Sequence, residues 1–123
     1  MAKDMKVAYL LDFYGDLLTE KQREALELYY NEDLSLGEIS SDLGITRQGV
    51  RENVKRAEAI LLEMEEKLGL AAKSGEISRS LGEVRRCIDI IDDKNMRIYR
   101  SDEINESIKV ILRELEKLKK LNE

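Results

Sequence analysis

The chain has 123 residues with 21 basic and 26 acidic side chains, giving a net charge of −5, and it contains one Cys, no His, no Pro and no Trp. A single Cys forms no internal disulfide, and without His the usual zinc, haem and proton-shuttle ligands are missing. The composition therefore excludes a disulfide scaffold and predicts a cytoplasmic protein. No apolar run approaches the roughly 20 residues of a membrane-spanning helix, so we expect no membrane insertion.

The charge is divided unevenly along the chain. Residues 1–70 carry 9 basic and 15 acidic side chains (net −6), whereas residues 71–123 carry 12 and 11 (net +1). Affinity for nucleic acid comes largely from Lys and Arg that displace counterions, so an acidic N-terminal half disfavours attraction of the whole domain to phosphates. Any nucleic-acid binding must therefore depend on a local basic patch.

The first two predicted elements are helices. The absence of Pro and the abundance of Glu, Lys, Leu and Arg favour an all-helical chain. A first helix is expected over residues 3–14, followed by Gly15 as its stop, because its apolar residues recur at three- and four-residue steps: Val7, Leu10, Leu11 and Tyr14. The capping box Thr19–Gln22 then begins a second helix that ends near Tyr30.

A short helix and a long helix are predicted next. A second capping box, Ser35–Glu38, begins the short helix, and Gly44 offers the permissive backbone for a sharp turn. Thr46 caps the long helix, and Gly69 follows its end. Its apolar residues recur at steps of 4, 3, 4, 3 and 4: Val50, Val54, Ala57, Leu61, Met64 and Leu68.

Small residues at 70–75 predict a short linker, which divides the chain into residues 1–70 and 71–123. A fifth helix is expected from Ile77 to Ile91, and the polar run at 92–95 ends its apolar pattern. Ser101 caps a sixth helix with a frayed, charged tail. Both helices repeat their apolar residues at steps of 4 and 3, which is typical of helical bundles.

The short helix, Gly-containing turn and long helix form the helix-turn-helix arrangement. Its expected apolar seam comprises Ile39, Leu43, Ile45, Val50 and Val54. At 100° per residue, Gln48, Glu52 and Lys55 lie opposite this seam on the long helix, flanked by Arg51 and Arg56. These side chains are therefore predicted to be free to contact a ligand.

The predicted outer face of the long helix carries both signs of charge. Arg, Lys and Gln near its start suit contacts with base edges and phosphates. Glu52 lies at the centre of the same face, and further acids follow: Glu58, Glu63, Glu65 and Glu66. The pattern therefore predicts a helix-turn-helix fold more firmly than it predicts duplex binding.

A resemblance to region four of bacterial sigma factors is carried by the run LLTEKQREALELYYNEDLSLGEISSDLGITRQGVRENVKRAE. With YLLDFYGDLLTEKQ in front and ITRQGVRENVKRAEAILLEMEEKL behind, the chain more closely resembles the small bacterial YlxM-like proteins over about residues 7–70. The resemblance implies a sigma-region-four-like helix-turn-helix without a wing. The residues themselves predict an all-α fold in which a helical C-terminal bundle follows it. It also implies a gene position beside the signal recognition particle GTPase and a role as an accessory or regulator of protein targeting.

Carried over position by position, the resemblance implies nucleic-acid contacts at five residues: Arg47, Gln48, Arg51, Lys55 and Arg56. Two positions depart from promoter-reading sigma proteins, which tend to be basic where Gly49 stands and amide-bearing where Glu52 stands. These departures argue against sequence-specific promoter reading.

Other candidate features have plainer explanations. Arg79, Arg85 and Arg86 are expected on a solvated face with intrahelical partners such as Glu83 and Asp89 rather than on an RNA-facing strip. The cluster Asp89, Asp92 and Asp93 lacks the loop spacing and Gly of an EF-hand and is expected to end a helix. We expect Cys87 to be an inert, small core residue. The aromatic residues are expected in the core rather than as base-stacking platforms: Tyr9, Phe13, Tyr14, Tyr29 and Tyr30.

The sequence predicts a non-enzymatic protein with no catalytic residues, no cofactor and no metal, because the Ser residues have no His partner and the seven Gly form no phosphate-binding loop. The predicted function is a nucleic-acid-binding accessory of the signal recognition particle pathway, whose partners are that particle's RNA or duplex DNA and its GTPase. Two alternatives remain: a DNA-binding transcriptional regulator, and a protein-only adaptor with an acidic surface. The apolar excess of the last helix predicts a homodimer through residues 71–123.

Overall fold

The computed structural model describes residues 2–123, and this part of the chain forms six α-helices and no strand. Residues up to Ala71 form one compact unit, and Ala72–Glu123 form a second. The all-helical prediction is confirmed. The elements of the chain are, in order, α1 (Met5–Tyr14), the short 3-10 helix η1 (Gly15–Leu17), α2 (Glu20–Tyr30), α3 (Leu36–Leu43), α4 (Arg47–Leu68), α5 (Leu70–Lys94), the π-helical segment η2 (Asn95–Tyr99) and α6 (Asp102–Leu121).

The predicted helix starts are confirmed by hydrogen bonds at the caps. Thr19 Oγ1 accepts from the Gln22 amide at 3.2 Å while the Gln22 side chain accepts from the Thr19 amide at 3.2 Å. The same reciprocal pair joins Ser35 and Glu38. Thr46 Oγ1 accepts from the Gly49 amide at 2.9 Å and so caps α4. These bonds satisfy amides that have no partner inside their own helix.

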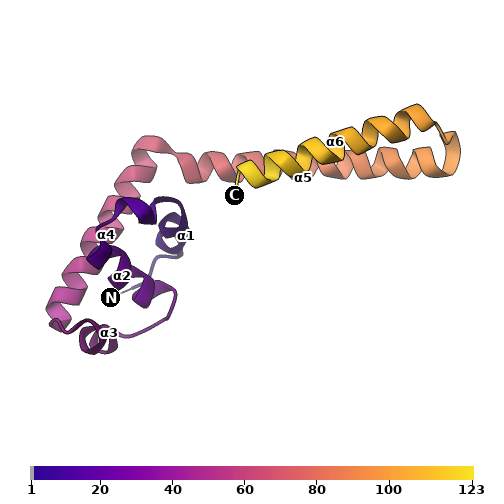
Figure 1. The fold of residues 1–123 in the computed structure, drawn as a ribbon. Coiled ribbons are helices and arrows are strands. Elements are labelled where there is room, and N and C mark those ends of the chain that lie inside the picture. The colour runs from indigo at the N-terminus through magenta and orange to yellow at the C-terminus, as the bar shows by residue number, and fades with distance from the viewer. Residues whose placement is uncertain (1) are drawn as a thin grey trace. The chain divides into compact units, whose positions relative to one another are not determined.

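In the first unit, α1, α2 and α3 pack against α4 (Figure 1). The predicted α4 stripe is largely buried, because Val50, Val54, Ala57 and Leu61 are all fully covered whereas Leu68 is 48% exposed. The core that surrounds this stripe consists of Val7, Leu10, Leu11, Tyr14, Leu18, Ala25, Leu26, Tyr29, Ile39 and Ala71.

The aromatic residues bear out the core prediction only in part. Tyr14 and Tyr29 are buried, and Phe13 and Tyr30 are partly buried against the same core. Tyr9 is 47% exposed, which contradicts the prediction for this residue. Its ring instead packs edge-on against Phe13, with 5.1 Å between ring centroids.

A hydrogen-bonded junction joins α1, the end of α4 and the start of α5. The Tyr14 hydroxyl donates to Glu65 Oε1 at 2.7 Å and accepts from the Leu70 amide at 3.0 Å. Glu65 Oε1 also accepts from the Ala71 amide at 3.0 Å. Burial, together with the neighbouring Glu65 carboxylate, raises the pKa of the Tyr14 phenol. The junction therefore caps the first amides of α5 with side chains that lie far away in the sequence.

The predicted linker at residues 70–75 is wrong, because these residues form the first turns of α5. The chain does turn at Gly69, whose φ of +62° lies in the left-handed region that favours glycine. A new helix follows at once, since Tyr14 and Glu65 supply its cap and alanines favour helix.

The second unit is a hairpin in which α6 runs back beside α5 (Figure 1). The α-helix α5 ends at Lys94, within the polar run at 92–95 as predicted, and the π-helical segment η2 continues from it to Tyr99. Asn95 is 2% exposed: its Nδ2 donates to the Ser101 carbonyl at 3.0 Å and its Oδ1 accepts from the Ser101 amide at 2.9 Å. The reversal itself occurs at Arg100, which has a left-handed φ of +51°.

Hydrogen bonds from an asparagine side chain also join the two helices at the open end of the hairpin. Asn122 Nδ2 donates to the Ser74 carbonyl at 3.0 Å and to Ser78 Oγ at 2.9 Å, and Ser74 Oγ donates to the Asn122 carbonyl at 3.2 Å. The predicted fraying of the C-terminal tail is therefore wrong as far as Asn122.

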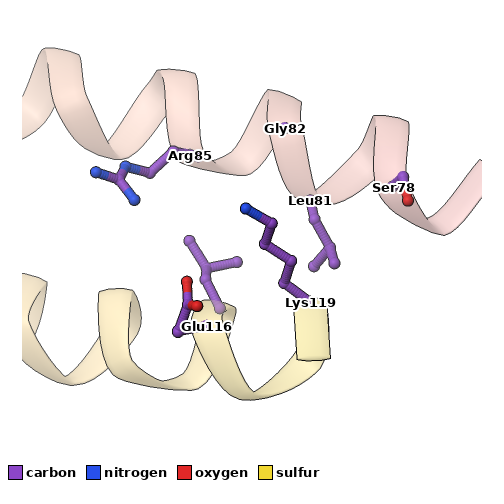
Figure 2. A pocket seen from close by; sticks show the side chains of 7 residues that line it. Ser78, Leu81, Gly82, Arg85, Glu116 and Lys119 are labelled. Atoms are coloured by element: carbon purple, nitrogen blue, oxygen red, sulfur yellow. The ribbon is translucent and has the colours of Figure 1, made fainter. Parts of the chain in front are cut away.

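The two helices of the hairpin bury little between them. Within residues 72–123 the buried apolar side chains are Ile88 and Ile108. A pocket of about 240 Å³ remains between α5 and α6 beside Gly82, where the absence of a side chain leaves space (Figure 2). Cys87 is exposed rather than a core residue, which contradicts the prediction, because the side of α5 that carries it is left uncovered.

We predict that Tyr14→Phe lowers the melting temperature by roughly 5 °C, because the Glu65 carboxylate and the Leu70 amide both lose the phenol as a partner. Thermal unfolding followed by circular dichroism measures the change. Tyr9→Phe is the control, since the Tyr9 hydroxyl makes one long contact of 3.4 Å to the Ala71 carbonyl. Equal melting temperatures for the two variants would contradict the structural role of the junction.

We predict that Asn95→Ala costs about 1–3 kcal/mol of unfolding free energy, because both polar groups of the Ser101 backbone lose their partner at the turn. Urea titration followed by the helical circular dichroism signal measures it. Met96→Ala, at the neighbouring residue that is 62% exposed, is expected to change little. The prediction fails if the two substitutions cost the same.

Candidate nucleic-acid interface

The candidate interface lies on the helix-turn-helix formed by α3, the turn at Gly44 and α4. Gly44 adopts a left-handed φ of +68°, as its place in the predicted turn requires. The Ser40 hydroxyl donates to the Ile45 carbonyl and closes the turn. Ile39, Val50 and Val54 form the buried seam, with Leu43 partly buried against it, whereas Ile45 is 38% exposed and lies at the margin of the seam rather than inside it.

The five predicted contact residues all lie on α4 and are all exposed: Arg47, Gln48, Arg51, Lys55 and Arg56. The burial of Val50, Val54, Ala57 and Leu61 fixes which side of α4 faces the core. At 100° per residue, Gln48 and Glu52 then point directly away from the core. The side chains that sequence reasoning selected are therefore available for contact.

The basic residues do not form one cluster. Arg47, Arg51 and Lys55 follow one another at four-residue intervals and make a row of about 12 Å along one edge of α4. Arg56 lies on the other side of the outer face, beyond Glu52. We call Arg47, Arg51 and Lys55 the basic row.

The basic row forms no salt bridge within residues 2–123, although the charge of Lys55 acts on the nearby Glu58 carboxyl and lowers its pKa against the larger effect of burial. Among residues 2–123, no carboxylate lies within salt-bridge distance of Arg47, Arg51, Lys55 or Arg56. Other arginines are paired: Arg23 contacts Asp16 at 2.6 Å and Glu27 at 2.9 Å. The α4 cations therefore keep their charge available for an external anion.

Two arginines of α5 bind carboxylates of their own helix, as expected for a solvated helix face. Arg85 binds Asp89 at 3.1 Å and Arg86 binds Glu83 at 2.6 Å, both within the same helix. This confirms the expectation of intrahelical partners for Arg85 and Arg86, whereas Arg79 is exposed and forms no salt bridge with a carboxylate of residues 2–123.

The Arg47 side chain lies against the bare backbone of Gly37 in the first turn of α3. A methyl group at Gly37 would stand 3.0 Å from Arg47 Nη2 and 3.1 Å from its Nε. Glycine therefore lets the guanidinium approach the start of α3 closely, which brings the first cation of the row beside a helix N-terminus.

The acidic residues of α4 differ in how close they lie to the basic side chains of the interface. Glu52 lies at the centre of the outer face, and Gln48 Nε2 is 3.5 Å from Glu52 Oε1. Glu58 follows beside Lys55, and burial raises the pKa of its carboxyl above the ordinary value of 4.5. Glu65 belongs to the junction with Tyr14 and Ala71 rather than to the outer face, so the acidic stretch of α4 is less uniform than its sequence indicates.

A hollow of about 410 Å³ flanks the outer face, between α2, the turn and α4. It is lined by Lys21, Glu24, Leu43, Ile45, Gly49, Glu52 and Asn53. Sequence reasoning missed Lys21 and Asn53 as neighbours of the interface. The missing signal is the packing of α2 against α4, which no local pattern carries.

Two further properties bear on the class of site. No group of three or more His, Cys, Asp or Glu residues within 2–123 is arranged to hold a metal ion. In the described part of the chain, no helix combines the length and the apolar content needed to cross a bilayer. The outer face of α4 carries exposed cations and the Gln48 amide on a packed helix, which suits binding to phosphates and base edges.

Comparison with known proteins agrees with this geometry. A family model described as "Putative helix-turn-helix protein, YlxM / p13 like" (UPF0122) matches residues 1–85. The chain is 50% identical over 109 residues to a UPF0122 protein of Thermoanaerobacter sp. strain X514, covering 89% of this chain and 90% of the relative. It is 40% identical over 118 residues to a UPF0122 protein of Bacillus cereus strain AH187, covering 96% and 98%. It is 52% identical over 84 residues to one of Desulforamulus reducens, covering 68% and 72%.

We predict that Glu58→Gln raises the melting temperature at pH 7 by a few degrees. Because burial raises the pKa of Glu58, the folded protein binds its proton more tightly than the unfolded chain does. The contribution of Glu58 to stability is therefore fully present below its unfolded pKa of about 4.5 and is lost as the pH rises through the higher folded value. The gain in the variant should shrink towards pH 4.

The control for Glu58 is Glu63→Gln, whose exposed carboxylate binds Lys67 at 3.0 Å. Thermal melts of the wild type and both variants at pH 4 and pH 7 test the prediction. A Glu58→Gln melting temperature at pH 7 equal to or below that of the wild type would show that the half-buried Glu58 carboxylate does not destabilise the fold.

Proposed function

The chain belongs to the UPF0122 family of YlxM/p13-like helix-turn-helix proteins, and from this premise we propose that it is a non-enzymatic, nucleic-acid-binding accessory of the signal recognition particle pathway. The resemblance noted above supports the pathway, since it implies a gene position beside the signal recognition particle GTPase. The single observation that supports binding is the basic row on α4, which forms no salt bridge within residues 2–123.

In this proposal the contacts to nucleic acid come from Arg47, Arg51 and Lys55, with Gln48 and Arg56 beside them. Cations on one edge of a helix bind phosphates and position the protein, whereas the outward amide of Gln48 reaches towards base edges. The Glu52 carboxylate limits the number of favourable contacts at the centre. The binding is therefore dominated by phosphates and is expected to be sensitive to salt.

The RNA of the signal recognition particle is the proposed ligand, and the particle's GTPase is the proposed protein partner. The protein acts in the cytoplasm as a homodimer through residues 71–123, without a cofactor. Residues 1–70 serve as the binding domain. This division of labour agrees with the location of the basic row in the first compact unit.

A second candidate is a DNA-binding regulator resembling sigma factor region four. One observation favours it: α4 follows the turn of a helix-turn-helix and exposes its N-terminal turns, the arrangement that enters the wide major groove of B-form DNA. The major groove of an RNA helix is too deep and narrow to be read in this way. A preference for RNA or for duplex DNA therefore separates the targeting accessory from the transcriptional regulator.

We predict that Arg51→Glu combined with Lys55→Glu lowers nucleic-acid affinity more than tenfold. It should also reduce the slope of log affinity against log salt by about 1.5, because two phosphate contacts are lost. Fluorescence anisotropy titrations against labelled signal recognition particle RNA and random duplex DNA, at low and moderate salt, measure both effects. Wild-type preference for the RNA supports the targeting role, and preference for the duplex supports the regulator.

The matched control is Lys73→Glu combined with Arg79→Glu, which changes the net charge equally at two exposed residues of α5. Its affinity should remain near that of the wild type. If the control loses binding and the α4 variant does not, the interface lies outside α4. If the wild type binds neither ligand, the protein-only adaptor replaces both candidates, with exposed acids such as Glu63 and Glu66 as its surface.

A further inference from the structure

Each helix of the hairpin carries a row of large apolar side chains that its neighbour does not cover. The row on α5 consists of Ile77, Val84 and Ile91, which are 46%, 44% and 48% exposed. The row on α6 consists of Ile104, Ile111 and Leu118, which are 38%, 37% and 49% exposed. Within each row the residues are seven positions apart, so each row runs nearly straight along its helix.

The hydrogen bonds at the two ends of the hairpin set the register of these rows. Asn95 pairs with Ser101 at the turn, and Ser74 pairs with Asn122 at the open end. This antiparallel register places Ile91 level with Ile104, Val84 level with Ile111, and Ile77 level with Leu118. The six residues therefore form three successive apolar layers.

Both rows lie on the same side of the hairpin. Residues of α5 that face α6 include Ile88 and Asn95, and the residues of α6 that face α5 include Ile108 and Asn122. Val84 lies four positions before the inward Ile88 on α5, and Ile104 lies four positions before the inward Ile108 on α6. In a pair of antiparallel helices, residues displaced by the same number of positions from the inward residue of their own helix lie on the same side of the pair. We call the six residues of the two rows the apolar face.

The opposite side of the hairpin is charged. The pocket beside Gly82 opens there, and Figure 2 shows that Arg85 from α5 and Glu116 and Lys119 from α6 surround it. Charged side chains remain solvated at little cost, whereas apolar ones do not. The apolar face is therefore the side of the hairpin that gains most from being covered.

The size of the apolar face fits a stable interface. The six side chains together expose roughly 500 Å², which equals the largest apolar patch on a typical monomer. The next row outward adds exposed residues that include Cys87 and Leu121, so the surface can extend towards the roughly 800 Å² that is usual for one side of a specific interface. A hairpin that buries only Ile88 and Ile108 has little core of its own, so it depends on such cover.

We propose that the apolar face binds the same face of a second copy of the chain, so that two hairpins form an antiparallel four-helix bundle. This inference rests on the homodimer of the proposed function and names its surface. Seven-residue spacing on both helices favours a second copy, because an identical set of three layers matches the first in register. Few charges border the contact: the outward row beyond the face carries Lys73 and Lys94 on α5 and Glu114 on α6.

The matched substitutions that test the surface are Ile111→Asp and Val110→Asp. These neighbours on α6 are both exposed and β-branched, at 37% and 48%, but they point about 100° apart around the helix. Size-exclusion chromatography with light scattering should give a dimer mass for the wild type and for Val110→Asp and a monomer mass for Ile111→Asp. Helical circular dichroism confirms that each variant remains folded.

Cys87 provides an independent measurement in the wild-type chain. It is the single cysteine, it is exposed, and it lies beside the apolar face between Val84 and Ile91. In a bundle whose helix axes are 8–10 Å apart, nitroxide labels on the two Cys87 residues lie within roughly 30 Å of each other. Pulsed EPR should therefore detect one intermolecular distance in this range.

The outcomes separate this inference from the proposed function. A dimeric wild type whose labels lie much farther apart, or an Ile111→Asp variant that stays dimeric, overturns the apolar face as the interface. A monomeric wild type overturns the homodimer together with this inference. Neither result alters the nucleic-acid titrations, whose outcome depends on Arg51 and Lys55 in the other unit.

Discussion

Burial of a single stripe of α4 is the constraint on which the first unit depends. Val50, Val54, Ala57 and Leu61 are covered by α1, α2 and α3, so every other residue of α4 has a fixed direction. The same helix therefore fills the core and presents Arg51 and Lys55 to solvent. A ligand site on such a rigid, packed helix is preorganised, because the backbone that carries the cations does not need to reorder on binding.

Salt bridges and hydrogen bonds within the chain distinguish the charged side chains that already have a partner from those that can contact a ligand. Arg23, Arg85 and Arg86 form salt bridges with nearby carboxylates, whereas the basic row forms none within residues 2–123. The Glu65 carboxylate also has partners inside the fold, since it accepts hydrogen bonds from the Tyr14 hydroxyl and the Ala71 amide. The number of acidic residues in the sequence of α4 therefore overstates the negative charge that its outer face presents to a ligand. The position of each partner, rather than the net charge of −5, decides what the surface offers.

Polar residues set the register of the hairpin, while many of its apolar residues stay exposed. The buried Asn95 and the half-buried Asn122 hold the two ends of α5 and α6 in one alignment, as polar core residues do in coiled coils. Between these ends the helices bury little, and the six residues of the apolar face stay partly uncovered. The two units thus differ: the first buries a core shared by four helices, whereas the second leaves three apolar layers partly exposed.

The sequence by itself determined the local features of the protein: the six helices, the capping residues Thr19, Ser35, Thr46 and Ser101, and the turn at Gly44. These features depend on residues within about four positions of one another, so periodicity and cap chemistry suffice to predict them. The exposure of the five contact residues followed from the same period. Tertiary structure alone decided the junction of Tyr14 with Glu65, the closure of the hairpin through Asn122 and Ser74, and the exposure of Cys87. These involve packing between distant segments, which leaves no pattern within a single helical turn.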